Sequence, residues 1–231
     1  MVTVTILTKD NEATLEQTLE SVKGYDVLVL DTGSSDETLE IAKRYGARIE
    51  KSTFIGFGKL KNMAAQLAEG DWILSLDADE VLSGSLPQEL DEGCVYSFPF
   101  HNYFNGKWIK GCGWYPDRHV RLYHKAHARF SDDEVHEKLQ GGRKVKLDLP
   151  IRHYSYRTID DFLVKMDRYS SLFAKQRKGK KSSLGKALLH SWWAFFKSYI
   201  IKRGFLCGPE GFIISQYNAH VAYYKYLKLA C

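Results

Sequence analysis

Three carboxylates crowd the end of a short apolar run, at Asp77, Asp79 and Glu80. The run itself, residues 72–76, has the length and composition of a buried strand. Carboxylates this close repel one another, and a hard divalent cation such as Mg²⁺ or Mn²⁺ relieves the repulsion while leaving positions open for phosphate oxygens. The sequence therefore predicts a divalent metal site at this strand end. The alternative is a solvated loop in which Asp79 or Glu80 caps a following helix.

The elements that precede these carboxylates alternate between strands and helices. Periodicity predicts strands at residues 2–7, 26–30 and 47–50, and helices at residues 12–23, 37–45 and 59–69. We expect Asp10 or Asn11 to cap the first helix. A capping box of Ser34 and Glu37 should start the second.

This alternation predicts an α/β fold with a mostly parallel sheet and right-handed crossovers. The carboxyl ends of parallel strands point the same way, so the strand exits at residues 8–11, at Asp31 and at residues 77–80 should share one edge of the sheet. Open α/β sheets bind their ligands at that edge. We therefore expect a ligand cleft lined by acidic and amide side chains.

Composition narrows the class of protein. The chain has 231 residues, 44% of them hydrophobic and 13% aromatic, which suffices for one substantial core and a small appendage. A net charge of +5 suits an anionic ligand or membrane surface, and we expect no nucleic-acid partner. The four cysteines form no C-x-x-C pair, which favours free cytosolic thiols over a zinc site or disulfides. The sequence shows neither a signal peptide nor a spanning helix, so we expect a cytoplasmic protein.

Four motifs in the first eighty residues, with two more beyond them, resemble a known family. They are TKDNE at residues 8–12, VLDTGSSDET at 29–38, FGKLKNMA at 57–64, LSLDADE at 74–80, GWYPDRHVRLYH at 113–124 and EVHEKL at 134–139. The first four resemble family 2 glycosyltransferases of the GT-A fold, a Rossmann-like fold. The last two resemble the branch that contains the lipopolysaccharide core β-1,4-glucosyltransferases.

The resemblance implies a nucleotide-diphospho-sugar donor, a Mg²⁺ or Mn²⁺ cofactor, and sugar transfer with inversion. It implies a catalytic domain over residues 1–155, with a donor half up to about residue 95, an acceptor half from 96, and a helical extension over 156–231. The residues that it places at the nucleotide sugar are Thr8, Asp10, Glu12, Asp31, Lys61, Asn62 and Asp77. The metal ligands that it implies are Asp79, Asp77 and His153.

Several of these residues have an ordinary structural alternative. Asp10 would serve equally as a helix cap and Asp31 as a turn former, and Glu12 would face a helix dipole. Lys61 would be a surface lysine. His153 would be a structural hydrogen bonder rather than a ligand.

The acceptor half should supply one base. A direct displacement needs a carboxylate to take the proton of the attacking hydroxyl, and the V-H-E motif implies that Glu137 is this base, with Asp133 as the runner-up. An Asn105-Gly106 turn predicts a β-hairpin there, and strands are expected at residues 120–123 and 145–151. Arg121 binds phosphate or forms a structural salt bridge.

The C-terminal residues change in pattern. An amphipathic helix is expected from Thr158, followed by a basic link at residues 177–183 and an aromatic-rich stretch at 187–205. Trp and Tyr beside clustered Lys and Arg are typical of a helix that lies in the membrane interface. The alternative is an ordinary core or dimer helix.

Together these features predict an inverting glycosyltransferase that moves a hexose, with glucose expected, from a UDP-linked donor to a lipid-linked glycan such as the lipopolysaccharide inner core. It would work as a peripheral protein on the cytoplasmic face of the membrane. Three alternatives stay open: a peptide or protein glycosyltransferase of the same family, a nucleotidyltransferase, and a non-catalytic membrane-binding module. The expected Gly-rich phosphate loop of a nucleotidyltransferase is not found near the first strand.

Overall fold

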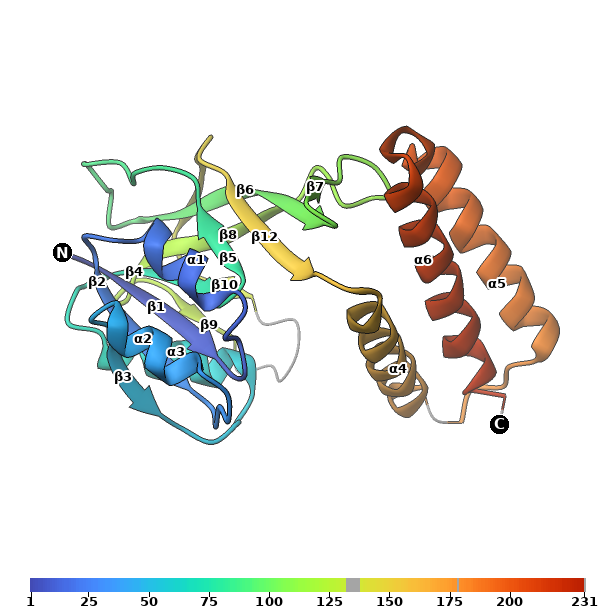
Figure 1. Cartoon of the computed structure of the whole chain (residues 1–231), viewed down its shortest axis with the longest axis horizontal. Coiled ribbons are helices and arrows are strands. Elements are labelled where there is room, and N and C mark those ends of the chain that lie inside the picture. Colours follow the sequence, from blue (N-terminus) through green and yellow to red (C-terminus); the bar gives the residue numbers. More distant parts are fainter. Residues whose placement is uncertain (132–137, 178, 231) are drawn as a thin grey trace. The chain divides into compact units, whose positions relative to one another are not determined.

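The computed structural model describes residues 1–131, 138–177 and 179–230 (Figure 1). The two residues predicted as the base, Glu137 and Asp133, lie outside the described residues. The chain divides into two compact units. The first comprises Met1–Phe100 with Arg118–His153, and the second comprises His101–Asp117 with Tyr154–Cys231.

A mixed sheet begins with a parallel half and continues with antiparallel strands. Its order is β3-β2-β1-β4-β8-β6-β12-β5, with β11 and β7 also paired to β6, and β9 and β10 form a separate pair. The strands are β1 (Val2–Thr8), β2 (Asp26–Asp31), β3 (Arg48–Lys51), β4 (Trp72–Asp77), β5 (Glu80–Leu82), β6 (Cys94–Phe104), β7 (Lys107–Trp108), β8 (Arg118–His124), β9 (Arg129–Phe130), β10 (Leu139–Gln140), β11 (Arg143–Lys146) and β12 (Ile151–Tyr156). The expected Rossmann-like α/β fold of the GT-A type is thereby confirmed.

Helices connect the parallel strands and make up most of the second unit (Figure 1). They are α1 (Leu15–Ser21), α2 (Thr38–Arg44), α3 (Phe57–Leu67), α4 (Ile159–Gln176), α5 (Leu184–Phe196), the π-helical η1 (Lys197–Ile201), the 3-10 helix η2 (Gly204–Cys207) and α6 (Pro209–Leu227). The amphipathic helix expected from Thr158 is confirmed as α4, and a capping box of Thr158 and Asp161, which was not predicted, starts it.

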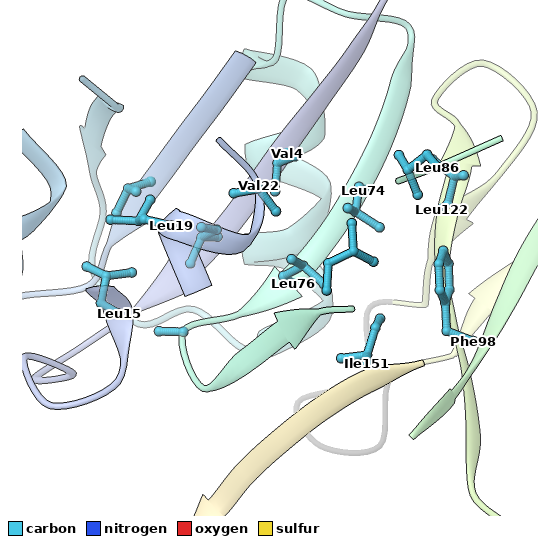
Figure 2. Packing of buried hydrophobic residues seen from close by; sticks show 14 of the residues in the cluster. Val4, Leu15, Leu19, Val22, Leu74, Leu76, Leu86, Phe98, Leu122 and Ile151 are labelled. Carbon is cyan, nitrogen blue, oxygen red and sulfur yellow. The ribbon is translucent and has the colours of Figure 1, made fainter. Parts of the chain in front are cut away.

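The main core of the first unit lies between the sheet and α1 (Figure 2). Val4 of β1 and Leu74 and Leu76 of β4 are fully buried there, together with Leu15 and Leu19 of α1. The central strands are covered on both faces, which explains why they read as nearly continuous apolar runs. This packing fixes β1 and β4 as neighbours, and their ends carry the predicted site.

The second unit has its own small core. Phe104 and Ile109 of the hairpin region pack with Phe162 of α4 and Ile214 of α6. Close packing also joins η2 to its surroundings, because a Cβ at Gly204 would lie 2.9 Å from the carbonyl oxygen of Ser198. The predicted hairpin turn is confirmed, since Asn105 and Gly106 both adopt positive φ between β6 and β7.

Three local predictions are wrong, and one of them, the capping box of Ser34 and Glu37, is described with the site below. Neither Asp10 nor Asn11 caps the first helix, which begins only at Leu15 and has no side-chain cap. The predicted single strand at residues 145–151 is instead the end of β11 and the start of β12, which pair with different neighbours. In these last two cases local propensity matched more than one chain path, and contacts distant in sequence decided between them.

Candidate donor and metal site

The strand exits meet at the carboxyl edge of the parallel sheet. In the register of β1 with β2, Thr8 lies opposite Asp31. On the other side of β1, Leu7 lies opposite Asp77 of β4. The sheet therefore brings together the ends of three strands that are far apart in sequence, as the alternation of elements predicted.

The loops after β1 and β2 are held together by hydrogen bonds. The carboxylate of Asp10 accepts from the backbone N–H of Ser35 at 2.7 Å, and the backbone N–H of Asp10 donates to the hydroxyl of Ser34 at 2.9 Å. The carboxylate of Glu12 accepts from the backbone N–H of Glu37 at 3.0 Å. These bonds replace the predicted capping box of Ser34 and Glu37, which is absent from α2. Asp10 and Glu12 thus fix the positions of the loops that adjoin the carboxyl edge of the sheet.

Asp31 is buried and holds its own turn. Its carboxylate accepts from the backbone N–H of Gly33 at 3.1 Å and from the hydroxyl of Ser34 at 2.5 Å. This is the arrangement that the turn-former alternative describes. A role for Asp31 at the nucleotide would therefore add to the structural role that its hydrogen bonds already give it.

The carboxylate of Asp77 lies between two cations. Lys61 Nζ of α3 is 3.2 Å from Asp77 Oδ1, and Arg121 Nη2 of β8 is 3.2 Å from Asp77 Oδ2. Burial alone would raise the pKa of Asp77, but these two cations outweigh burial and hold it well below its usual range. Lys61 is buried, so its alternative as a surface lysine is wrong.

Arg121 also neutralises Glu80, which is only 1% exposed. Arg121 Nε donates to Glu80 Oε2 at 2.8 Å, and Arg121 Nη2 donates to Glu80 Oε1. Burial is the largest influence on Glu80 and raises its pKa despite the guanidinium. The structural alternative for Arg121 is therefore confirmed. No pattern in the sequence indicated that one arginine would pair with two of the three crowded carboxylates.

Asp79 faces an imidazole instead. His153 Nε2 of β12 lies 3.6 Å from Asp79 Oδ2, and about a quarter of each side chain is exposed, 24% for His153 and 25% for Asp79. Burial alone would lower the pKa of His153, but the nearby carboxylates, Asp79 foremost, raise it. The intervening Ala78 is held in place because its carbonyl accepts from the Thr18 hydroxyl at 3.0 Å.

Asn62 points to a different part of the first unit. Its amide Nδ2 donates to the carbonyl of Phe130 at 2.9 Å, and its Oδ1 accepts from the backbone N–H of Phe130 at 2.9 Å. The side chain therefore holds β9 against α3. A contact between Asn62 and a nucleotide stays a prediction, and it would have to share these bonds.

The arrangement fits a divalent cation in part. Asp79 and His153 offer the carboxylate oxygen and imidazole nitrogen that Mn²⁺ accepts. Both oxygens of Asp77 are occupied by ion pairs. Within residues 1–131, 138–177 and 179–230, no group of three or more His, Cys, Asp or Glu side chains is arranged to hold a metal. Two protein ligands leave the remaining positions to diphosphate oxygens and water, as is usual for Mg²⁺.

Comparison with known proteins agrees with this geometry. The family model for glycosyl transferase family 2 matches residues 3–94, which include the strand exits of the parallel half. An uncharacterized glycosyltransferase of Rickettsia felis is 31% identical over 97% of this chain and 87% of its own length. One of Rickettsia typhi is also 31% identical, over 97% of this chain and 85% of its own length.

Solved structures with a similar arrangement are more distant. The first 349 residues of Staphylococcus aureus TarS, crystallised with UDP, are 17% identical, with a TM-score of 0.47 over 90% of this chain and 75% of that one. Glucosyl-3-phosphoglycerate synthase of Mycobacterium tuberculosis, crystallised with Mn²⁺, UDP and glucosyl-3-phosphoglycerate, is 22% identical. Its TM-score is 0.35 over 46% of this chain and 44% of that one.

Proposed function

The chain belongs to glycosyl transferase family 2, and we propose that it moves a hexose, glucose in the first instance, from a UDP-linked donor to a lipid-linked glycan. The acceptor that we propose is the lipopolysaccharide inner core or a glycan of similar chemistry. Transfer would proceed with inversion. The membership excludes neither a peptide acceptor nor another nucleotide, so these remain outcomes of the tests below.

One observation carries the proposal of a donor site. At the carboxyl edge of the sheet Asp77 is balanced by two cations, whereas the neighbouring Asp79 faces an imidazole. His153 can release its proton, which leaves its ring nitrogen and the Asp79 carboxylate, each about a quarter exposed, able to bind one cation together. Asp79 is therefore the carboxylate of this edge that we expect to receive a metal-bound diphosphate.

We propose that Asp79 and His153 hold a Mg²⁺ or Mn²⁺ ion, with Asp77 facing the ribose. The cation would supply charge neutralisation of the departing diphosphate. Lys61 and Arg121 keep Asp77 ionised, so that carboxylate can accept hydrogen bonds from ribose hydroxyls. Thr8, Asp10, Glu12 and Asp31 would frame the nucleoside, since their loops form the adjoining rim of the edge.

The acceptor hydroxyl must lose its proton as it attacks the anomeric carbon. We propose that Glu137 takes this proton, with Asp133 as the alternative, although both lie outside the described residues. One carboxylate suffices because a single displacement forms no covalent sugar intermediate, and this also requires inversion. We assign the donor half to about residues 1–95 and the acceptor half to about 96–155.

We propose that the protein acts at the cytoplasmic face of the membrane, where a lipid-linked acceptor is available. Among the described helices, none has both the length and the apolar content needed to cross a bilayer. Contact with the membrane would therefore be peripheral.

The experiment that tests this function measures release of the nucleoside diphosphate, UDP or GDP, from the sugar donor. Purified protein is incubated with Mn²⁺ and, separately, UDP-glucose, UDP-galactose, UDP-N-acetylglucosamine and GDP-mannose, with lipid-linked glycans extracted from a Gram-negative bacterium. We expect release with UDP-glucose that depends on the acceptor and yields a product of inverted anomeric configuration. Release that requires a peptide and does not depend on the glycan would identify the protein as a peptide or protein glycosyltransferase. No release from any nucleotide sugar would contradict the proposal.

A further inference from the structure

Exposed large apolar residues are concentrated in the helical part of the second unit, from α5 to the first turn of α6. The exposed large apolar residues of α5 are Leu184, Leu188, Leu189, Trp192 and Trp193, and those that follow in η1, η2 and the first turn of α6 are Ile200, Ile201, Phe205, Leu206 and Phe212. We call these ten residues the apolar surface. Trp192 is 62% exposed and Leu206 68% exposed, although such residues are usually buried. An exposed apolar surface of this extent marks an interaction site.

Ring contacts link several of these residues through neighbouring aromatic side chains. Trp192 and Trp193 both stack on Phe196, with centroids 5.5 and 5.9 Å apart. Further along, Tyr199 contacts Phe205 at 6.3 Å and Phe212 at 5.9 Å. Helices α5 and α6 pack side by side within this unit (Figure 1), and Ala187 of α5 and Ala219 of α6 are buried.

The charged residues in this part of the sequence are basic, and the acidic residues at its two ends, Asp167 and Glu210, pair with Lys228 and Lys107. Residues 168–209 contain ten Lys and Arg and neither Asp nor Glu. Lys186 and Lys197 of the α5–η1 stretch are exposed, and so are Lys202 and Arg203 before η2. Aromatic rings flanked by exposed cations suit the boundary between acyl chains and anionic headgroups.

This charge decides between possible occupants. In a symmetric dimer the same surface would meet its own copy, so cations would be brought against cations with no acidic residue of 168–209 to balance them. A neutral glycan carries no negative charge with which the exposed lysines and arginine could pair. An anionic bilayer satisfies both the rings and the charges.

We propose that the apolar surface docks the protein on an anionic phospholipid membrane, with α5 lying in the plane of the interface and Lys197 and Lys202 at the level of the phosphates. The biological role of this docking rests on the proposed function, because docking would bring the enzyme to a lipid-linked acceptor. Its physical basis is independent of sugar transfer.

The test is co-sedimentation of the full chain with vesicles of phosphatidylcholine alone or with 30% phosphatidylglycerol. We expect binding to the anionic vesicles that weakens as salt rises from 0.05 to 0.5 M, and little binding to the neutral ones. Lys197→Gln with Lys202→Gln should lower the partition constant by about 25-fold, from about fivefold per cation near an anionic surface. Trp192→Ser with Trp193→Ser should lower it by about tenfold or more.

A matched control is available on α4. Leu163 and Val164 are also exposed, but that helix carries Asp160, Asp161 and Asp167. Leu163→Ser with Val164→Ser should bind vesicles as the unchanged chain does. Circular dichroism melts would check that each variant is folded. A thermal shift with UDP and Mn²⁺ would test the donor site separately.

Three results would overturn the proposal. They are equal binding to neutral and anionic vesicles, vesicle binding that neither pair of substitutions weakens, and a concentration-dependent dimer in sedimentation equilibrium that the Trp192→Ser, Trp193→Ser variant abolishes. Vesicle binding without any nucleotide shift would sustain the docking surface and remove the proposed transferase activity. A nucleotide shift without vesicle binding would do the reverse.

Discussion

The pairing of Arg121 with Glu80 allows a quantitative prediction about stability. Glu80 is 1% exposed and Arg121 9% exposed, and two hydrogen bonds join them. Arg121→Met removes the cation and leaves the carboxylate buried without compensation. Loss of one partner of such a pair costs about 3–5 kcal/mol of unfolding free energy. We therefore expect a loss of this size in urea denaturation at pH 7.5.

The pH dependence of that loss identifies its cause. Burial raises the pKa of Glu80 above its usual value even beside Arg121, and removal of the cation must raise it further. A carboxyl whose folded pKa is raised destabilises the fold fully above that pKa, and the penalty fades as the pH falls toward the unfolded value of about 4.5. The deficit of Arg121→Met should therefore shrink between pH 7.5 and pH 5. The lowered pKa of Asp77 contributes only below this window.

A double substitution is the matched control. Glu80→Gln with Arg121→Met leaves an amide in place of the charge, so it should lose less stability than Arg121→Met alone. The reasoning is refuted if Arg121→Met costs less than about 1 kcal/mol, the value typical of an exposed pair. It is also refuted if the deficit stays constant from pH 7.5 to pH 5.

Other predictions concern single side chains. Asn62→Ala should lower the unfolding free energy by about 1–3 kcal/mol in urea denaturation, because it removes both hydrogen bonds between the Asn62 amide and the backbone of Phe130. Gly204→Ala should cost about 1–3 kcal/mol in the same assay, since its Cβ would stand 2.9 Å from the Ser198 carbonyl. Glu137→Gln should retain donor binding, but its rate of UDP-glucose turnover should fall by a factor of about 10² or more. Normal turnover in this variant, together with a loss in Asp133→Asn, would identify Asp133 as the base instead.

The location of the candidate site at the carboxyl edge of the sheet was predictable, because it follows from the direction of the parallel strands. Apolar runs placed the strands, and parallel pairing then required Asp31 and Asp77 to lie at one edge. The local chemistry of the loops was less predictable. Asp10 was expected to cap its own helix, but its carboxylate holds the backbone of Ser35 in the next loop. Propensity identifies a residue that accepts hydrogen bonds without identifying which donor it meets.

Contacts between distant residues account for the rest. Lys61 was predicted at the nucleotide sugar, with a surface lysine as the alternative, but no pattern in the sequence paired its Nζ with Asp77 Oδ1, which lies 3.2 Å away. Arg121 sits in an ordinary strand pattern, and only the antiparallel placement of β8 beside β4 brings it to Asp77 and Glu80. Neither pairing has a local signal, because both depend on how the two halves of the sheet meet.

The central claim is that Asp79 belongs to a metal-dependent nucleotide site, and calorimetry of UDP binding tests it most directly. The measurement uses the unchanged chain with and without Mn²⁺, Asp79→Ala, and Asp71→Ala as a control, since Asp71 lies exposed just before the opposite end of the same strand. The account predicts Mn²⁺-dependent UDP binding that Asp79→Ala weakens at least about tenfold and Asp71→Ala leaves intact. UDP affinity that is indifferent both to Mn²⁺ and to Asp79→Ala would contradict it.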